Sequence, residues 1–219
     1  MGQAILTPLQ RHVLKHLSKE PLIGKNFYLT GGTALAEYYL HHRLSEDLDF
    51  FCEKEIDILW VTTLAQRIKQ KIHATKVDIQ QSYNRNLVFF TVNTHLLKTE
   101  FTYFPFPNIE QPKVQGGIRI DSLLDIAVNK FFTIYQQPAS RHFIDLYSIL
   151  KQGDITWEQI KKLARNKFDV VIDSLQLGSQ LFAAKDIGQL PTMIQPLHEK
   201  EWRDFFLTKA KELKEKIGT

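Results

Sequence analysis

The sequence has few of the features that mark secreted or membrane-embedded proteins. Its 219 residues contain one cysteine, Cys52, which excludes an internal disulfide framework and suits a reducing compartment. No apolar run approaches the roughly 18 residues of a membrane span. The first residues also lack the cationic start and apolar core of a secretory signal. We therefore expect a cytoplasmic protein with no membrane segment.

Strong charge of one sign is also lacking, because 28 basic residues face 24 acidic ones for a formal net charge of +4. This balance is compatible with a polyanionic partner but does not identify one. The excess lysines lie at residues 69–76, 161–167 and 209–217, and in the last of these segments they alternate with acidic residues at helical spacing. Such segments are read either as solvated helix faces or as nucleic-acid contacts.

Hydrophobic periodicity predicts an α+β first half. The expected elements are a helix over 8–19, a strand over 26–30, a short helix over 33–42, a strand over 47–51, a helix over 57–72 and three β-rich segments over 77–104. Residues 105–117 hold three prolines and two glycines and are interpreted as a linker. We expect a mixed-sheet domain over residues 1–115.

The second half is predicted to be helical. The expected helices cover 121–135, 138–152, 156–168, 169–184 and 198–217. Thr156 with Gln159 three residues later has the spacing of a capping box. We therefore expect a helical domain over residues 116–219, which would close a cleft over the first domain.

Within the stretch GGTALAEYYLHHRLSEDLDFF (31–51), two aspartates are held one residue apart. On a strand, Asp47 and Asp49 would point to the same face, about 6–7 Å apart. Two like charges at that distance repel unless a cation neutralises them, and Mg²⁺ prefers carboxylates together with phosphate oxygens. The other interpretation is a pair of exposed aspartates at a sheet edge, which the flanking Leu48 and Phe50 disfavour.

The glycine pair at the start of the same stretch suits a phosphate. Gly31 and Gly32 follow a strand and precede a helix, so backbone N–H groups can approach a phosphate chain. An ordinary turn is the alternative. Ser45 would either donate to a phosphate or cap the turn, and Arg43 would either bind a phosphate or brace the aspartates.

Taken together, this stretch resembles the first motif of the AbiEii/AbiGii toxin family, within the polymerase-β-like nucleotidyltransferase superfamily. The resemblance implies a third carboxylate on a later strand. In LLKTEFTYFPFP (96–107), Lys98, Glu100 and Thr102 would share one face, so Glu100 is the candidate, although a surface glutamate is the alternative. Aspartate is commoner at this position in the family.

The resemblance continues in the helical half. IDSLLDIAVNKFF (120–132) resembles the family's third motif, in which Lys130 matches a lysine that faces the cleft. SRHFIDLYSIL (140–150) resembles the fourth motif, in which Asp145 matches a carboxylate. Gln137 and His142 depart from that motif, at the positions of an arginine and an aspartate, so a bidentate phosphate clamp is missing.

The resemblance implies transfer of a nucleoside monophosphate from a nucleoside triphosphate to a hydroxyl. Asp47 and Asp49 would hold Mg²⁺, and Glu100 would either help bind a second ion or take the proton of the acceptor. Gly31, Gly32, Arg43 and Ser45 would bind the nucleotide. Lys130 would neutralise charge on a phosphate, and Asp145 would orient either Lys130 or the acceptor. It also implies a toxin–antitoxin or phage-defence setting, an antitoxin protein, and acceptors such as the 3′ end of tRNA. The alternatives are a catalytically reduced nucleotide-binding protein that acts through a partner and, disfavoured by the motif spacing, a D-x-D glycosyltransferase.

Overall fold

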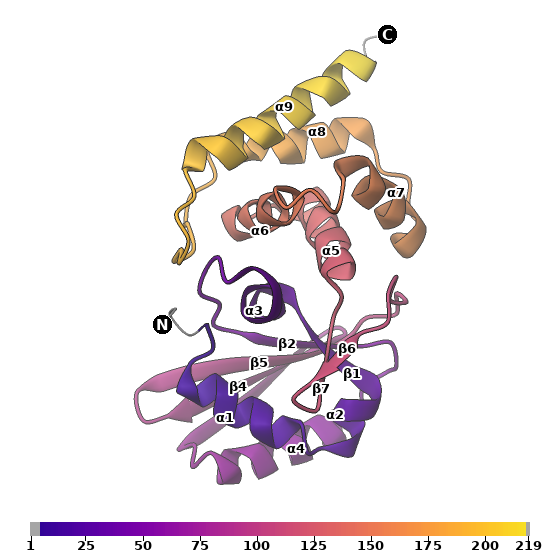
Figure 1. Cartoon of the computed structure of the whole chain (residues 1–219). Coiled ribbons are helices and arrows are strands. Elements are labelled where there is room, and N and C mark those ends of the chain that lie inside the picture. Colours follow the sequence, from indigo (N-terminus) through magenta and orange to yellow (C-terminus); the bar gives the residue numbers. More distant parts are fainter. Residues whose placement is uncertain (1–4, 218–219) are drawn as a thin grey trace. The chain divides into compact units, whose positions relative to one another are not determined.

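The chain divides into two compact units in a computed structural model that describes residues 5–217 (Figure 1). The sheet unit comprises the chain up to Tyr39 together with Leu44–Ser122. The helical unit comprises Leu40–Arg43 together with the chain from Leu123 onward. The short segment Leu40–Arg43 therefore belongs to the helical unit, and the chain re-enters the sheet unit at Leu44, shortly before Asp47.

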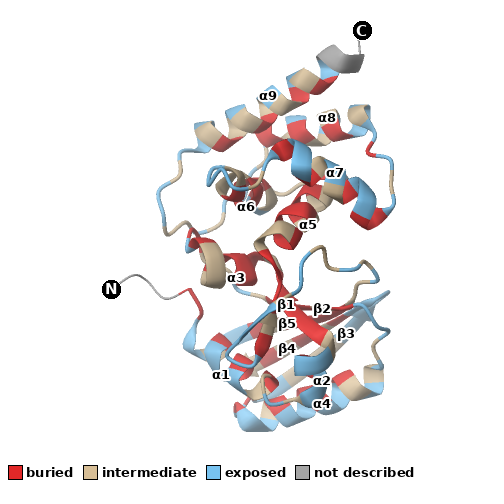
Figure 2. Cartoon of the chain, turned by 45° about the vertical axis from the view of Figure 1, so that its right-hand side comes forward, coloured by how far each residue is buried: buried red, intermediate tan, exposed pale blue. Residues whose placement is uncertain are grey.

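The sheet unit is built on a seven-stranded mixed sheet in the order β3-β4-β5-β2-β1-β7-β6. Its strands are β1 (Phe27–Thr30), β2 (Leu48–Cys52), β3 (Lys76–Ser82), β4 (Arg85–Val92), β5 (His95–Tyr103), β6 (Lys113–Gln115) and β7 (Ile118–Ile120). The pairs β2–β5 and β1–β7 are parallel, and the other neighbours are antiparallel. The central strands are the most buried part of this unit (Figure 2).

One face of the sheet packs against helices. The helices of this unit that precede β1 or follow β2 are α1 (Pro8–Leu17), α2 (Pro21–Asn26) and α4 (Ile58–Lys71). Phe27, Phe50 and Phe101 point to this face, and the ring of Trp60 from α4 lies 5.2 Å from Phe27 and 6.0 Å from Phe101. Because side chains alternate along a strand, Thr30, Asp49 and Glu100 point to the other face.

The glycine turn leads into a short, widened helix. α3 (Gly31–Leu35) follows β1 directly and continues as the π-helical turn η1 (Ala36–Leu40). The helix expected over 33–42 therefore starts two residues earlier, because Gly31 adopts a φ of +73° that lets the chain turn at once. It ends at Leu40, since His41 has a left-handed φ of +52°.

Residues 113–120 form a hairpin that extends the sheet. Gly116 and Gly117 have φ values of +58° and +79°, as a tight turn between β6 and β7 requires. β7 then pairs in parallel with β1 through Leu29 and Ile120. The linker expected over 105–117 is thus partly strand, and the boundary expected after residue 115 falls inside this hairpin.

The helical unit contains α5 (Leu123–Gln136), α6 (Ser140–Leu150), α7 (Trp157–Phe168), α8 (Ser174–Phe182), the 3₁₀ turn η2 (Ala183–Lys185) and α9 (Glu199–Ile217). Its core includes Phe143, and the ring centroids of Trp202 and Phe206 lie 6.0 Å and 4.8 Å from that of Phe143. As predicted, the Thr156 side chain accepts a hydrogen bond from the Gln159 backbone N–H. The helix expected from residue 169 begins at Ser174, because Asp169 is left-handed and Asp173 supplies the N-cap.

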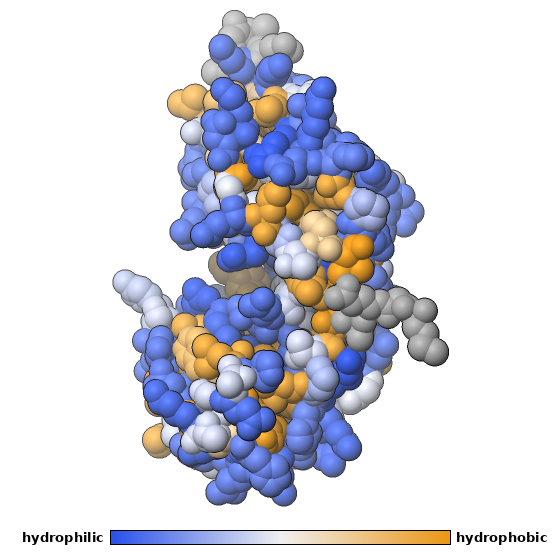
Figure 3. Space-filling view, turned by 90° about the vertical axis from the view of Figure 1, so that its left-hand side faces the viewer, coloured by the Kyte–Doolittle hydropathy of each residue, from blue (hydrophilic) through white to orange (hydrophobic). Residues whose placement is uncertain are grey.

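The surface seen in Figure 3 is mainly hydrophilic, with smaller hydrophobic areas between the charged side chains. Large apolar side chains that are well exposed include Leu59, Val114, Val171 and Leu175. Among the residues that the structure describes, no helix has both the length and the apolar character needed to cross a membrane.

Candidate active site

Polar side chains form a row across four neighbouring strands of the sheet unit. The Cα partner of Asp49 is Glu100 on one side and Thr30 on the other. Asp121 follows β7 directly, and its carboxylate accepts a hydrogen bond of 2.6 Å from the Thr30 hydroxyl. Paired residues of adjacent strands point to the same face. The register therefore gathers three carboxylates on the sheet face opposite α4.

Gly31 and Asp49 are in direct contact at the centre of this row. A Cβ atom on Gly31 would lie 2.6 Å from Oδ2 of Asp49, much closer than such atoms approach. The Thr33 hydroxyl, one turn into the helix, donates to the backbone carbonyl of Asp47. The glycine turn and the D-x-D segment, which are separate motifs in the sequence, thus form one structure.

Asp47 precedes β2 and is half-exposed. Its Oδ2 accepts a 2.6 Å hydrogen bond from the Lys98 ammonium, which also lies 3.8 Å from Oε2 of Glu100. The ammonium thereby offsets the repulsion between the two carboxylates. A cation is already accommodated between Asp47 and Glu100 in this arrangement.

Glu100 is buried and strongly anchored. The Arg85 guanidinium donates to both of its oxygens at 2.7 Å, and the Thr102 hydroxyl donates to Oε1 at 2.6 Å. Burial by itself would raise the pKa of Glu100, but the hydrogen bonds from Arg85 and Thr102 lower it. Glu100 is therefore held as a carboxylate, on the face that it was expected to share with Lys98 and Thr102.

Asp121 connects several elements of the sheet unit. Besides Thr30, its carboxylate accepts from the Asn108 side-chain amide and from the Ser122 backbone N–H, both at 3.1 Å. Its backbone N–H donates to Leu29, and its carbonyl accepts from the Tyr39 hydroxyl at 2.7 Å. The residue thus holds the end of β1, where the glycine turn begins.

A second cluster of charges lies within the helical unit around Asp145, which is fully buried. Arg43 donates to both oxygens of Asp145 at 2.6 and 2.8 Å. The Lys130 ammonium lies 2.7 Å from Oδ2, and Nε2 of His42 lies 2.9 Å from Oδ1. Burial would raise the pKa of Asp145, but the charges of Lys130 and Arg43 hold it well below its usual value.

His142 lies beside Lys130, with Nδ1 of the ring 3.5 Å from the ammonium. Burial and then the positive charge of Lys130 lower the pKa of His142 to about 3. The imidazole is neutral at physiological pH and can only accept a hydrogen bond from Lys130. Gln137 lies on the surface just beyond the end of α5.

The structure places the predicted residues in two groups. Gly31, Gly32, Ser45, Asp47, Asp49 and Glu100 belong to the sheet unit, and Arg43, Lys130 and Asp145 belong to the helical unit. Ser45 is connected to the sheet unit through its carbonyl, which accepts from the Gln10 side chain at 2.9 Å. Over the described residues, no three His, Cys, Asp or Glu side chains surround one point suited to a metal ion.

Several residues of these clusters were not selected from the sequence. Arg85, Thr30, Asp121 and His42 carried no motif signal, because their roles depend on strand register and helix packing. A weak signal existed for Arg85, since a cation on a strand next to Glu100 could neutralise it. Thr30 could have been noted as the last strand residue before the glycine turn.

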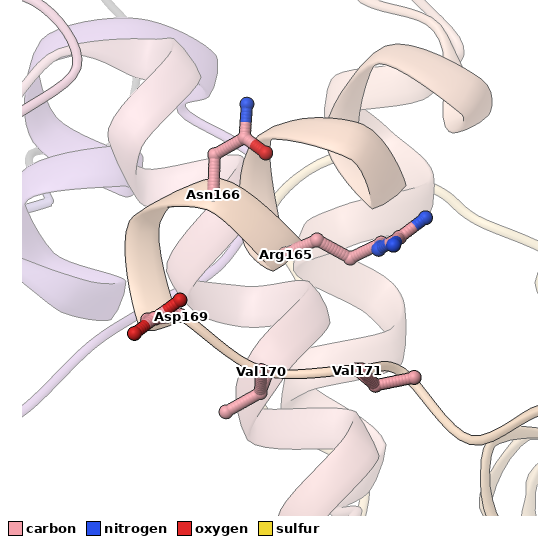
Figure 4. A pocket seen from close by; sticks show the side chains of 5 residues that line it. All are labelled: Arg165, Asn166, Asp169, Val170 and Val171. Carbon is pink, nitrogen blue, oxygen red and sulfur yellow. The ribbon is translucent and has the colours of Figure 1, made fainter.

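The helical unit also has a surface hollow that contains none of the predicted site residues. It has a volume of about 450 Å³ and is lined by Arg165, Asn166, Asp169, Val170 and Val171. Figure 4 shows these side chains around the end of α7 and the segment that follows it.

Comparison with known families and structures gives a consistent assignment. The family model described as nucleotidyl transferase AbiEii toxin of type IV toxin–antitoxin systems matches residues 12–215. A protein from Aquifex aeolicus, called uncharacterized protein aq_aa25, is 28% identical over 194 residues, which cover 87% of this chain and 89% of the relative.

Two solved structures from Helicobacter pylori share the fold. A candidate nucleotidyltransferase superimposes with a TM-score of 0.60 at 22% identity, over 96% of this chain and 93% of the other. The protein JHP933 superimposes with a TM-score of 0.57 at 24% identity, over 96% and 90% of the two chains. The α+β class expected from the sequence is thereby confirmed.

Proposed function

We propose that this chain, which belongs to the nucleotidyl transferase AbiEii toxin family, transfers a nucleoside monophosphate from a nucleoside triphosphate to an acceptor hydroxyl with the help of Mg²⁺. The family makes the chain a nucleotidyltransferase. The observation that carries the finer proposal is the contact between Gly31 and Asp49, with Glu100 as the strand partner of Asp49. It joins the glycine turn, which we propose to bind phosphate, to a carboxylate pair.

The donor set on this face suits Mg²⁺. Asp47, Asp49 and Glu100 offer hard carboxylate oxygens, and the Lys98 ammonium at 2.6 Å from Asp47 and 3.8 Å from Glu100 shows that a cation is tolerated there. Bound Mg²⁺ would neutralise charge on the triphosphate and on the attacking oxygen. Asp47 and Asp49 would be the principal ligands, while Glu100, oriented by Arg85, would contribute its remaining lone pairs.

The chain's own groups would bind and align the nucleotide. Backbone N–H groups at Gly31 and Gly32, together with the Ser45 hydroxyl, would hold the β and γ phosphates. Lys130 would neutralise the α or γ phosphate, and Asp145 would orient its ammonium. Both guanidinium donors that Arg43 directs at Asp145 are in use, so Arg43 would support the nucleotide through Asp145.

The reaction itself is a single displacement at phosphorus. The acceptor oxygen forms a bond to the α-phosphorus, the bond to the pyrophosphate oxygen breaks, and the hydroxyl proton leaves to a carboxylate or to water. Glu100, kept ionised by its hydrogen bonds, would be a carboxylate near the acceptor. Pyrophosphate is the leaving group.

The setting follows from the family. Membership of a type IV toxin–antitoxin family supports an antitoxin protein as a partner. We also propose a cytoplasmic location. An RNA such as the 3′ end of tRNA is the proposed acceptor. Action of the sheet unit and the helical unit as two domains, with the helical unit closing over the aspartates, is part of the same proposal.

One observation favours a second candidate, a nucleotide-binding protein with reduced catalysis that acts through a partner. His142 stands where the family motif has an aspartate, and with a pKa of about 3 it cannot donate a proton at neutral pH. Gln137, at the position of an arginine, removes a bidentate phosphate donor. Substrate binding is the step that both departures would weaken.

Incubation with each radiolabelled nucleoside triphosphate, total RNA and Mg²⁺ tests the proposal. We expect label in RNA and pyrophosphate release that requires both RNA and Mg²⁺. The Asp49→Asn variant should give neither. Nucleotide binding without pyrophosphate release for every triphosphate would support the second candidate instead, and a Gln137→Arg variant that remains inactive would reinforce that result.

A further inference from the structure

The sheet unit has a pocket that no role above uses. It has a volume of about 310 Å³, and it is lined by residues from α2, β1, the segment after β2, the loop before β6 and β7. Three of its lining side chains are cations: Lys25, Lys54 and Arg119. Glu53 is the one carboxylate among the residues that line it.

The charge balance of this pocket is positive. Lys25 and Lys54 are exposed, and neither has an ion pair within the described part of the chain. Arg119 donates to the Lys25 carbonyl at 3.1 Å, which brings its guanidinium to the same rim. The Glu53 carboxylate accepts from the Asn108 backbone N–H at 3.4 Å, so it faces the loop.

The pocket is adjacent to the row of carboxylates and is linked to it by strand β1 and by hydrogen bonds. Tyr28, which lines the pocket, is two residues before Thr30 on β1, so it points to the same sheet face at about 6–7 Å along the strand. Asn108 also lines the pocket, and its side-chain amide donates to Asp121, which in turn accepts from Thr30. Thr30 is the strand partner of Asp49.

We propose that this pocket binds backbone phosphates of a single-stranded nucleic acid, the acceptor of the transfer. This inference rests on the proposed function, because a strand that presents its hydroxyl near Asp49 must place its neighbouring nucleotides next to that residue. A sugar–phosphate backbone carries one negative charge per nucleotide, and cations from three elements around a concave surface match it. The row of carboxylates itself would repel the strand, so the cations beside it supply the attraction.

The test compares two double variants, each of which removes two lysine charges from the sheet unit. Lys25→Gln/Lys54→Gln empties the pocket of two exposed cations without disturbing a buried contact. Lys15→Gln/Lys71→Gln removes two exposed cations from α1 and α4, on the helix-covered side of the sheet. Binding of a fluorescent mixed-sequence single-stranded oligoribonucleotide is measured by anisotropy over a range of salt concentrations.

For the pocket variant we expect a Kd at least tenfold higher at low salt. The slope of log K against log salt should fall in magnitude by about 1.4, since two phosphate contacts are lost at about 0.7 each for single strands. The control variant should stay within about twofold of the wild type. The KM for the acceptor should rise in the pocket variant while the KM for the nucleoside triphosphate does not.

Equal effects of the two double variants would overturn the inference. So would a rise in the KM for the triphosphate with unchanged oligonucleotide binding, which would assign the pocket to the nucleotide. Polyglutamate that binds as tightly as RNA and depends on Lys25 and Lys54 would point to an acidic protein instead. If the wild type binds RNA through this pocket yet transfers nothing, the proposed function fails while the binding site stands.

Discussion

Gly31 leaves just enough room for the carboxylate of Asp49, whose Oδ2 would lie 2.6 Å from a Cβ atom at that position. The same glycine has a φ of +73°, which disfavours any L side chain. The two requirements are independent, one steric and one conformational. They meet at the residue that joins the turn to the aspartate pair.

Replacing this glycine should therefore impair the site itself. For Gly31→Ala we expect kcat/KM to fall at least about tenfold, because Asp49 must shift, and stability to fall by about 1–2 kcal/mol from the left-handed backbone. Gly24→Ala is the matched control, since nothing lies within 4 Å of its added Cβ. Pyrophosphate release and urea unfolding measure the two effects. Equal activities in both variants would contradict the assigned contact.

The aspartates can be tested without changing the shape of the site. Asp49→Asn and Asp47→Asn should each lower kcat by on the order of 100-fold or more, because the charge that binds Mg²⁺ is lost. Stability should change by at most about 1 kcal/mol, because the relief of repulsion between neighbouring carboxylates is offset by the lost attraction to Lys98 and Arg85. Asp78→Asn, on the edge strand β3, should leave the rate unchanged. Pyrophosphate release titrated with Mg²⁺ is the measurement, and wild-type rates in Asp49→Asn would refute the metal-binding role.

Two buried threonines allow a direct comparison of one hydrogen bond. Thr30 donates to Asp121 at 2.6 Å, whereas the Thr99 hydroxyl is buried and has no hydrogen-bond partner in the described structure. Thr30→Val should cost about 1–3 kcal/mol, because the buried carboxylate of Asp121 loses the hydrogen bond from Thr30, while Thr99→Val should be neutral or stabilising. Denaturant unfolding of both variants gives the answer. A similar loss in the two would show that the bond to Asp121 contributes nothing.

The cluster around Asp145 should dominate the stability of the helical unit. Asp145→Asn leaves the buried cations Arg43 and Lys130 without their carboxylate, so we expect a loss of about 3–5 kcal/mol. The exposed pair of Lys151 and Glu201, with side chains 59% and 38% exposed, is the contrast. Lys151→Met should cost at most about 1 kcal/mol. Urea unfolding followed by a helical signal compares them, and equal losses would show that Asp145 is not an anchor.

His142 should make stability depend on pH. The unfolded chain binds a proton at this residue near pH 6.5, whereas the folded chain binds one only near pH 3. Between these values the unfolded state holds more protons, so the free energy of unfolding falls as pH falls, and the full contribution is present above pH 6.5. At pH 5 the loss from this group is at most about 2 kcal/mol.

The His142→Gln variant isolates this effect, because it keeps a polar side chain that does not titrate. Its free energy of unfolding should decrease less than that of the wild type between pH 7 and pH 5. Denaturant titrations at several pH values provide the measurement. Parallel curves for the two proteins would show that His142 titrates near its ordinary pKa.

Local sequence patterns were sufficient for most helices and strands. The alternation in residues 96–104 correctly placed Lys98, Glu100 and Thr102 on one face, since alternation follows from strand geometry alone. Local patterns failed where the structure of a segment depends on the elements that it packs against or pairs with. The hairpin of β6 and β7 looked like a linker because its strands are short and depend on pairing, of β6 with β7 and of β7 with β1. The start of α8 was misplaced because residues 170–173 are apolar enough to resemble a helix.

The sequence by itself determined the α+β class, the glycine turn, the D-x-D segment and the strand face of Glu100, because each depends on periodicity or on a motif within a few residues. Only the tertiary structure decided what these groups contact. Glu100 lies beside Asp49 because β2 and β5 pair in parallel across about fifty residues of chain, and Arg85 reaches Glu100 through a second pairing. Arg43, expected at a phosphate or at the aspartates, is instead bound to Asp145. A buried carboxylate pairs with the cations that the packing of the chain brings close to it. The number of residues between two side chains in the sequence does not reveal whether they are close in the fold.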